Sequence, residues 1–187
     1  MKNAYLLLSF IFCIFLSSCA SPGSKKVSFD DFSGTERTET LIGTLKSATS
    51  QNAGMMNNAT LFFITEESAT LDNQSKDLFF SINTYCEALQ NCSMSAKKGN
   101  KVVFLIDDYR HGFKLRQDAA KHGPISGLLS PAWVEKIEIG PLDESIINRI
   151  AFAKEIKLKI YGNRYSKEYL LSEKQVELLR NEISSVN

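Results

Sequence analysis

The stretch Glu155-Ile156-Lys157-Leu158-Lys159-Ile160-Tyr161 alternates polar and apolar residues without interruption. A period of two predicts a β-strand with one buried and one exposed face. Gly162-Asn163-Arg164-Tyr165 then supplies turn residues, and a second strand is predicted over residues 167–171. The fold of the C-terminal third is built around these two strands.

Helices are predicted on both sides of this strand pair. Pro141 precedes a window whose apolar residues share one helical face: Leu142, Ile146, Ile147, Ile150 and Ala153. Downstream, Ser172 and Gln175 have the spacing of a capping box, and a buried stripe follows at Val176, Leu179 and Ile183. With a strand at residues 133–139, the ending is predicted to be β-α-β-β-α.

The preceding region has the shorter period of strands. Strands are predicted over residues 27–32, 38–45, 60–65, 78–85, 101–106 and 113–116. Residues 107–112 are predicted to be a hairpin connection, and residues 117–131 a long irregular loop. The expected fold class is α+β, with a mostly antiparallel sheet and two main helices, in one globular domain at 27–187.

The N-terminus has the features of an export signal. Lys2 precedes an apolar run that is too short to span a membrane and ends in Leu16-Ser17-Ser18-Cys19. These four residues resemble the lipobox of bacterial lipoprotein precursors, in which the cysteine becomes acylated. The resemblance implies a signal peptide at 1–18 and lipidation at Cys19, followed by a lipidated tether at 19–26.

The resemblance also implies a location in the cell envelope, where acyl chains on Cys19 bind the membrane. Ala20 occupies the position at which aspartate retains enteric lipoproteins in the inner membrane, so the outer membrane, facing the periplasm, is expected. The ending resembles uncharacterised bacterial envelope lipoproteins through Ala153-Lys154, Gly162, Leu171-Ser172, Gln175 and Leu179-Arg180.

Net charge argues against a nucleic-acid partner. The chain has 22 basic and 21 acidic residues, and Lys2 is the only charged residue before Cys19. The mature chain is therefore neutral, and Lys25-Lys26 and Lys97-Lys98 are isolated basic pairs in the sequence. A nucleic-acid-binding protein needs a concentrated basic face, so no nucleic acid is expected.

Two cysteines remain in the mature domain besides Cys19. Cys86 and Cys92 are separated by five residues, and an oxidising compartment favours a disulfide between them. A redox pair is disfavoured because the spacing is not Cys-x-x-Cys, and zinc with His111 and His122 would require reduced thiols. No metal or other cofactor is expected.

No catalytic constellation is found in the sequence. Asp107-Asp108-Tyr109-Arg110-His111 is the densest polar cluster, and it is interpreted as a solvated turn rather than an acid–base site. Ser95-Ala96-Lys97-Lys98 matches S-x-x-K but lacks the partner motifs. The protein is therefore not expected to be an enzyme.

The leading functional hypothesis is a membrane-anchored, non-catalytic binding or assembly module whose partner is an envelope protein. The alternatives are a lipoprotein that binds a small apolar or amphipathic ligand between the Phe-rich sheet and the helices, and an unrecognised envelope hydrolase. The long loop at 117–131 is the predicted partner-binding element. Its candidate contact residues, including the tryptophan that follows it, are Gln117, His122, Leu128, Leu129 and Trp133.

Overall fold

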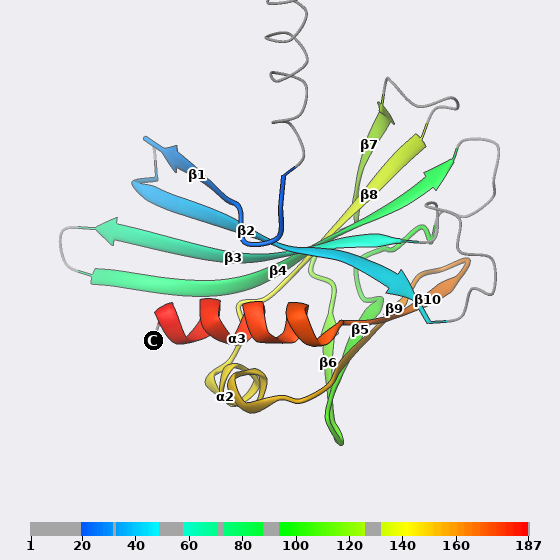
Figure 1. Ribbon diagram of the computed structural model, residues 1–187. Helices are drawn as coiled ribbons and strands as arrows, with labels where there is room; N and C mark the ends of the chain where they lie inside the picture. Colours follow the sequence, from blue (N-terminus) through cyan, green and yellow to red (C-terminus); the bar gives the residue numbers. More distant parts are fainter. Residues whose placement is uncertain are drawn as a thin grey trace, which may run out of the picture.

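The structure, a computed structural model, describes residues 20–31, 33–48, 58–70, 73–87, 94–125 and 132–186. The described chain begins with eight strands and ends with a helix (Figure 1). The first strands are β1 (Lys25–Asp30), β2 (Thr35–Ser47), β3 (Ala59–Thr70), β4 (Asn73–Glu87), β5 (Lys101–Ile106), β6 (Tyr109–Lys114) and β7 (Ala120–Ile125). The ending comprises β8 (Ala132–Ile139), α2 (Glu144–Phe152), β9 (Ile156–Tyr161), β10 (Ser166–Leu170) and α3 (Glu173–Val186).

All strand pairs are antiparallel. The ten-stranded sheet has the order β6-β5-β9-β10-β2-β3-β4-β8-β7, and β1 pairs with β2 off this path. The fold class is therefore α+β, mostly antiparallel sheet with two helices, and the predicted β-α-β-β-α ending is confirmed as β8-α2-β9-β10-α3.

Strand β2 joins the two parts of the sheet. Its first half pairs with β1, whereas Lys46 and Ser47 at its end pair with β10. Between them the register shifts at Gly43, where φ is +133° and an added Cβ would lie 2.9 Å from Gln175 Nε2. Gln175 Nε2 donates to the carbonyl of Thr44 at 2.9 Å, and its Oε1 accepts from Ser172 N at 2.8 Å. The predicted capping residue therefore also ties α3 to the bend in the sheet.

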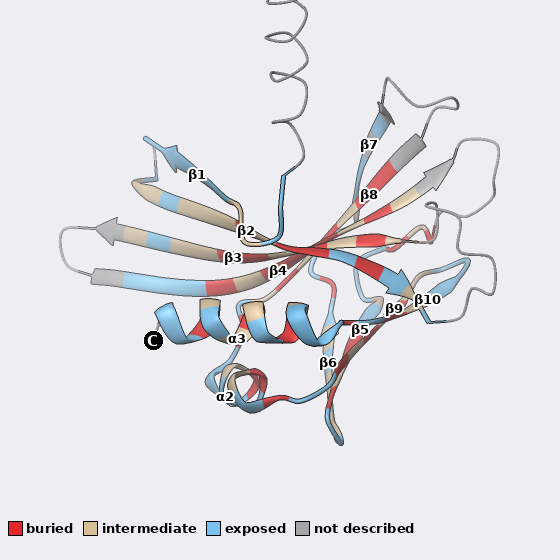
Figure 2. Ribbon diagram, viewed as in Figure 1, coloured by how far each residue is buried: buried red, intermediate tan, exposed pale blue. Residues whose placement is uncertain are grey.

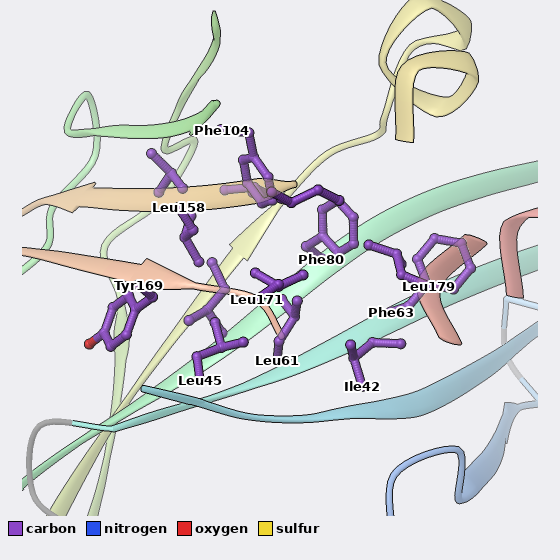
Figure 3. Packing of buried hydrophobic residues seen from close by; sticks show 14 of the residues in the cluster. Ile42, Leu45, Leu61, Phe63, Phe80, Phe104, Leu158, Tyr169, Leu171 and Leu179 are labelled. Carbon is purple, nitrogen blue, oxygen red and sulfur yellow. The ribbon is translucent and has the colours of Figure 1, made fainter. Parts of the chain in front are cut away.

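The core lies between the sheet and the helices, where buried residues concentrate (Figure 2). Aromatic rings from successive strands contact one another: the Phe63 and Phe80 centroids are 5.9 Å apart, and those of Phe80 and Phe104 are 5.2 Å apart. Leu179 of α3 packs in the same cluster (Figure 3). The Phe-rich strands and α3 thus contribute to one buried cluster, and the ligand-binding alternative stays a prediction.

The strands of the N-terminal half are found where they were predicted, but several differ in extent. Only β5 has the predicted bounds. β3 and β4 continue well past their apolar centres, and the Lys76–Glu67 ion pair (2.9 Å) joins these extensions. The outer ends of this hairpin lie beyond the core, so no apolar pattern marks them.

Two predicted loops are shorter in the structure. The hairpin at 107–112 has only Asp107 and Asp108 as its turn, because residues 109–112 already pair with β5. The irregular loop at 117–131 contains β7, which pairs with β8 around a bulge between His122 and Ile125. This strand was missed because its sequence, AKHGPI, has no alternation of polar and apolar residues and contains Gly and Pro, which are typical of loops.

The ordered domain begins earlier than the expected tether allows. Gly23 N donates to Leu41 O at 2.7 Å, Leu41 N donates to Ser24 O at 2.9 Å, and β1 starts at Lys25. Residues 23–26, assigned to the tether from sequence, are therefore fixed against β2. Neither described helix has the length and apolarity to cross a membrane.

Candidate functional site

The β5–β6 turn is fixed to the segment that follows α2. Asp107, with φ of +50°, accepts hydrogen bonds through Oδ1 from the backbone of Lys154 (3.0 Å) and Glu155 (2.9 Å). Its own N–H donates to Glu155 O at 2.9 Å. Asp is favoured in such turns because its short side chain bonds nearby backbone and tolerates positive φ. The Asp107 carboxylate thus positions the turn against α2.

The N-terminus of α2 lies across from the β5–β6 turn, near β6. Asp143 is the N-cap, and its Oδ1 accepts from Ile146 N at 3.0 Å and from Ser145 Oγ at 2.6 Å. These hydrogen bonds, with that from Ser145 the larger influence, lower the pKa of Asp143 below its ordinary 3.8. His111 Nε2 from β6 lies 3.9 Å from Asp143 Oδ2.

Aromatic contacts join α2 to the inner face of β6. The Arg149 guanidinium carbon lies 3.6 Å from the centroid of the Tyr109 ring, within the range of a cation–π interaction. The His111 and Phe113 rings are 4.5 Å apart. Arg149 and Tyr109 therefore hold the helix and the hairpin at a fixed separation.

An open hollow of about 700 Å³ lies between the turn and the helix. Phe152, the last residue of α2, lies at this hollow and is 81% exposed. The other lining residues are Ile106, Asp107, Asp108, Tyr109, Ser145, Asn148 and Arg149. We call this region the α2 hollow. It combines two aromatic side chains, a cation, two carboxylates, and amide and hydroxyl groups.

A testable consequence concerns the Asp143 cap. Asp143→Ala is expected to destabilise the domain by about 1 kcal/mol, because Ala cannot accept the Ile146 N–H. Asp143→Asn keeps an acceptor and should cost less. Since the folded-state pKa is lowered, the charge contribution is present above pH 3.8 and is lost as pH falls through the folded-state pKa. Urea titrations from pH 7 to pH 2 should therefore show that the difference in free energy of unfolding between wild type and Asp143→Asn becomes smaller at low pH. A difference that does not change with pH would contradict this.

Among the predicted partner-binding residues, Gln117 has a described side chain, and it does not line the α2 hollow. Gln117 is exposed and lines a separate hollow of about 160 Å³ with Lys136 and Glu138. His122 pairs with Val134 in the β7–β8 ladder. Leu128 and Leu129 lie outside the described residues. The loop hypothesis therefore stays a prediction.

Two of the other predicted residues meet in the sheet. Trp133 of β8 is the cross-strand partner of Cys86 of β4. Cys92 and Cys19 lie outside the described residues, so the disulfide and the lipidation site stay predictions. Among the described residues, no three His, Cys, Asp or Glu side chains are grouped to hold a metal ion.

Sequence reasoning missed a buried polar group at the opposite end of the core. Glu135 of β8 is only 5% exposed. Its Oε2 accepts from Met94 N and its Oε1 from Ala96 N, each at 3.0 Å. Nearby, burial lowers the pKa of Lys167 and raises that of Tyr169, and Glu135 raises both. A signal was present, because Glu135 has the same strand parity as the buried Ile137 and Ile139.

Phe152 and Arg149 were also missed as site residues. Phe152 lies off the buried stripe formed by Ile146 and Ile150, and a large apolar residue off such a stripe is a recognisable signal of an exposed contact. Comparison of the sequence and fold with protein families, curated proteins and solved structures finds no match.

Proposed function

We propose that the chain is an envelope lipoprotein, anchored through acyl chains on Cys19, that acts as a non-catalytic binding module for an envelope protein. The α2 hollow is its proposed binding surface. The observation that carries this proposal is the 81% exposure of Phe152 beside a hollow that Tyr109 and Arg149 also line.

These three residue types are suited to an interface. Aromatic residues and arginine are enriched among residues that contribute most to binding between proteins. Covering an exposed aromatic side chain contributes about 25 cal/mol for each Å² of apolar surface removed from water. The cation–π contact holds Arg149 against Tyr109 before any partner arrives, which reduces the entropy lost on binding.

The carboxylates around the hollow support a non-catalytic role. Asp107 accepts two backbone N–H groups, and Asp143 caps α2 and accepts from Ser145. A general base must instead reach a proton on the substrate. Asp107 and Asp143 are therefore engaged in holding the walls of the hollow, and Asp108, the other carboxylate that lines it, is exposed at the β5–β6 turn.

The start of the ordered chain supports an anchored domain. Gly23, four residues after Cys19, already bonds to Leu41. Four residues span at most about 14 Å even when fully extended, and Ser24 N donates to Ser21 O at 2.9 Å, which shortens this segment further. Acyl chains on Cys19 would therefore hold the domain close to the bilayer. Ala20 in the sorting position favours the outer membrane.

Capture from native membranes tests the binding surface. Phe152→Ala is expected to lose most of the envelope protein that the wild-type lipoprotein captures after crosslinking, because it removes the exposed ring. Phe29→Ala is the matched control, since Phe29 is 62% exposed and lies on β1. If Phe29→Ala loses the captured envelope protein and Phe152→Ala keeps it, the α2 hollow is not the binding surface. Recovery of lipids alone, equally by both variants, would favour the ligand-binding alternative.

A separate prediction tests the anchor. Cys19→Ser removes the thiol that would be acylated, so labelling with a fatty-acid analogue is expected to fall to background. An uncleaved or misprocessed precursor should accumulate. Detergent-free fractionation of wild-type cells should place the protein with outer-membrane markers. Persistent label on Cys19→Ser would refute the lipoprotein assignment, and wild-type protein with inner-membrane markers would refute the sorting assignment.

A further inference from the structure

The outward face of four adjacent strands carries a concentration of basic side chains. In β5 and β9 the residues Val102, Phe104, Leu158 and Ile160 point into the core, so the alternate residues point outward. The pairing of β6, β5, β9 and β10 aligns the outward residues in three rows. Two complete rows are Arg110-Leu105-Lys157-Leu170 and Gly112-Val103-Lys159-Glu168. The third row consists of the pairs Lys114-Lys101 and Tyr161-Ser166, which lie one position beyond the β5–β9 ladder. We call this surface the basic face.

Charge on the basic face is only partly neutralised by the chain itself. It holds five basic residues and one acidic residue, Glu168, although the whole chain has 22 basic and 21 acidic residues. Lys157 pairs with Glu155 at 2.7 Å and Lys159 with Glu168 at 3.6 Å. Within the described residues, Lys101, Arg110 and Lys114 have no carboxylate at ion-pair distance. The face therefore carries a net positive potential.

The centre of the basic face is hollowed and apolar. A hollow of about 200 Å³ is lined by Val103 and Leu105 together with Arg110, Lys157 and Lys159, and also by Tyr161 and Glu168. Gly112 lies opposite Val103 in the ladder, but Val103 is itself only 8% exposed, so Leu105 supplies most of the apolar surface. The hollow thus has an apolar floor with cations on both sides and the Glu168 carboxylate at its β10 edge.

We propose that the basic face binds an extended acidic segment of a partner protein. Side chains on one side of an extended chain recur about every 6.6 Å, twice the rise per residue. Arg110 and Lys114, which have no carboxylate at ion-pair distance among the described residues, lie two such repeats apart along β6, so carboxylates on one side of an extended partner can meet both. An apolar side chain on the partner then fits over Leu105. This surface is on the opposite side of the β5–β6 hairpin from the α2 hollow.

The position of the N-terminus favours a protein over a lipid surface as the occupant. The described chain begins in the dark-blue segment above β2 in Figure 1, where Gly23 bonds to Leu41, whereas β5, β6 and β9 lie in the lower part of the molecule. A bilayer held by Cys19 is near that entry, so the basic face is available to partners away from the membrane. This choice of occupant rests on the anchor of the proposed function, but the charge argument does not.

The test uses purified full-length lipoprotein in neutral detergent and a fluorescent synthetic peptide of alternating Glu and Val. Anisotropy should show binding that weakens as salt is raised. The same peptide with Gln in place of Glu should bind about tenfold more weakly, because it carries no charge. Lys159→Glu should lower the affinity for the acidic peptide by a similar factor, about tenfold.

Lys76→Glu is the matched control. Lys76 and Lys159 have the same side-chain exposure, 38%, and each pairs with one glutamate, so each reversal places a second carboxylate beside an existing one. Lys76→Glu should change the affinity less than about twofold, since it lies outside the face. Equal weakening by both variants, or equal binding of the Gln peptide, would overturn the proposal. So would Lys159-dependent binding to phosphatidylglycerol vesicles or to single-stranded DNA without binding to the peptide. None of these outcomes requires acylation of Cys19, which the fatty-acid labelling tests separately.

Discussion

Replacing Gly162 with alanine is expected to destabilise the domain by about 3 kcal/mol, because the new methyl group overlaps the backbone of Met94. An added Cβ would lie 2.7 Å from Met94 Cβ and 2.8 Å from Met94 C, and closer still to the Met94 carbonyl oxygen. Met94 is fully buried, and its N–H donates to Glu135. The segment therefore cannot move away without breaking that hydrogen bond. The loss is large for a domain whose total stability is of the order of 5–15 kcal/mol.

Gly112→Ala provides the control for this substitution. Gly112 also lies in the β5–β9 half of the sheet, but its added Cβ would meet only Val103 Cγ2, at 3.9 Å. That distance is an ordinary contact, so the free energy of unfolding should change by less than about 1 kcal/mol. Urea unfolding followed by circular dichroism measures both variants. If Gly162→Ala unfolds within error of Gly112→Ala, the close approach of Met94 is not a feature of the folded protein.

The C-terminal third could be predicted from sequence because each of its signals is local. The alternation of residues 155–161 predicts a strand with one buried face whatever the rest of the chain does. Strand β9 buries Ile156, Leu158 and Ile160, as that pattern requires. The capping box needs only residues three apart, and Ser172 and Gln175 bond as predicted. The further bond from Gln175 to Thr44 could not be predicted, because it depends on where β2 bends.

The strand-rich half could be predicted in kind but not in extent. Apolar centres such as Leu61-Phe62-Phe63-Ile64 indicate strands because they lie against the core. The outer residues of β3 and β4 are held by pairing between neighbouring strands, for example Glu67 with Lys76. Backbone pairing is indifferent to side-chain polarity, so hydropathy carries no information on where such strands end.

The basic face could not be predicted because it depends on register. Lys101, Arg110, Lys114, Lys157 and Lys159 are spread over three strands and nearly 60 positions of sequence. No two of them are adjacent, so a search for basic runs finds only the pairs Lys25-Lys26 and Lys97-Lys98. Pairing of β6, β5 and β9 is what brings the five together. A chain with nearly equal numbers of basic and acidic residues can therefore still have a locally basic surface.

Glu135→Ala is expected to destabilise the domain by about 3–5 kcal/mol, because it leaves two buried backbone donors without an acceptor. Glu135 accepts from Met94 N and Ala96 N, and both of these residues are almost fully buried, so water cannot easily replace the carboxylate. The substitution also removes the negative charge that raises the pKa of Lys167 and so partly offsets the larger lowering caused by burial. Glu135→Gln keeps one acceptor oxygen but turns a donor toward the second N–H, so its cost should be about half as large.

Glu138→Ala is the control from the same strand, since Glu138 faces outward and is 28% exposed, bonding Arg37 instead. Urea unfolding should therefore rank the variants, from most to least destabilised, as Glu135→Ala, Glu135→Gln and Glu138→Ala. Hydrogen exchange should show the Met94 and Ala96 amides losing protection only in the first two. Retained protection of both amides in Glu135→Ala would show that another acceptor holds the segment.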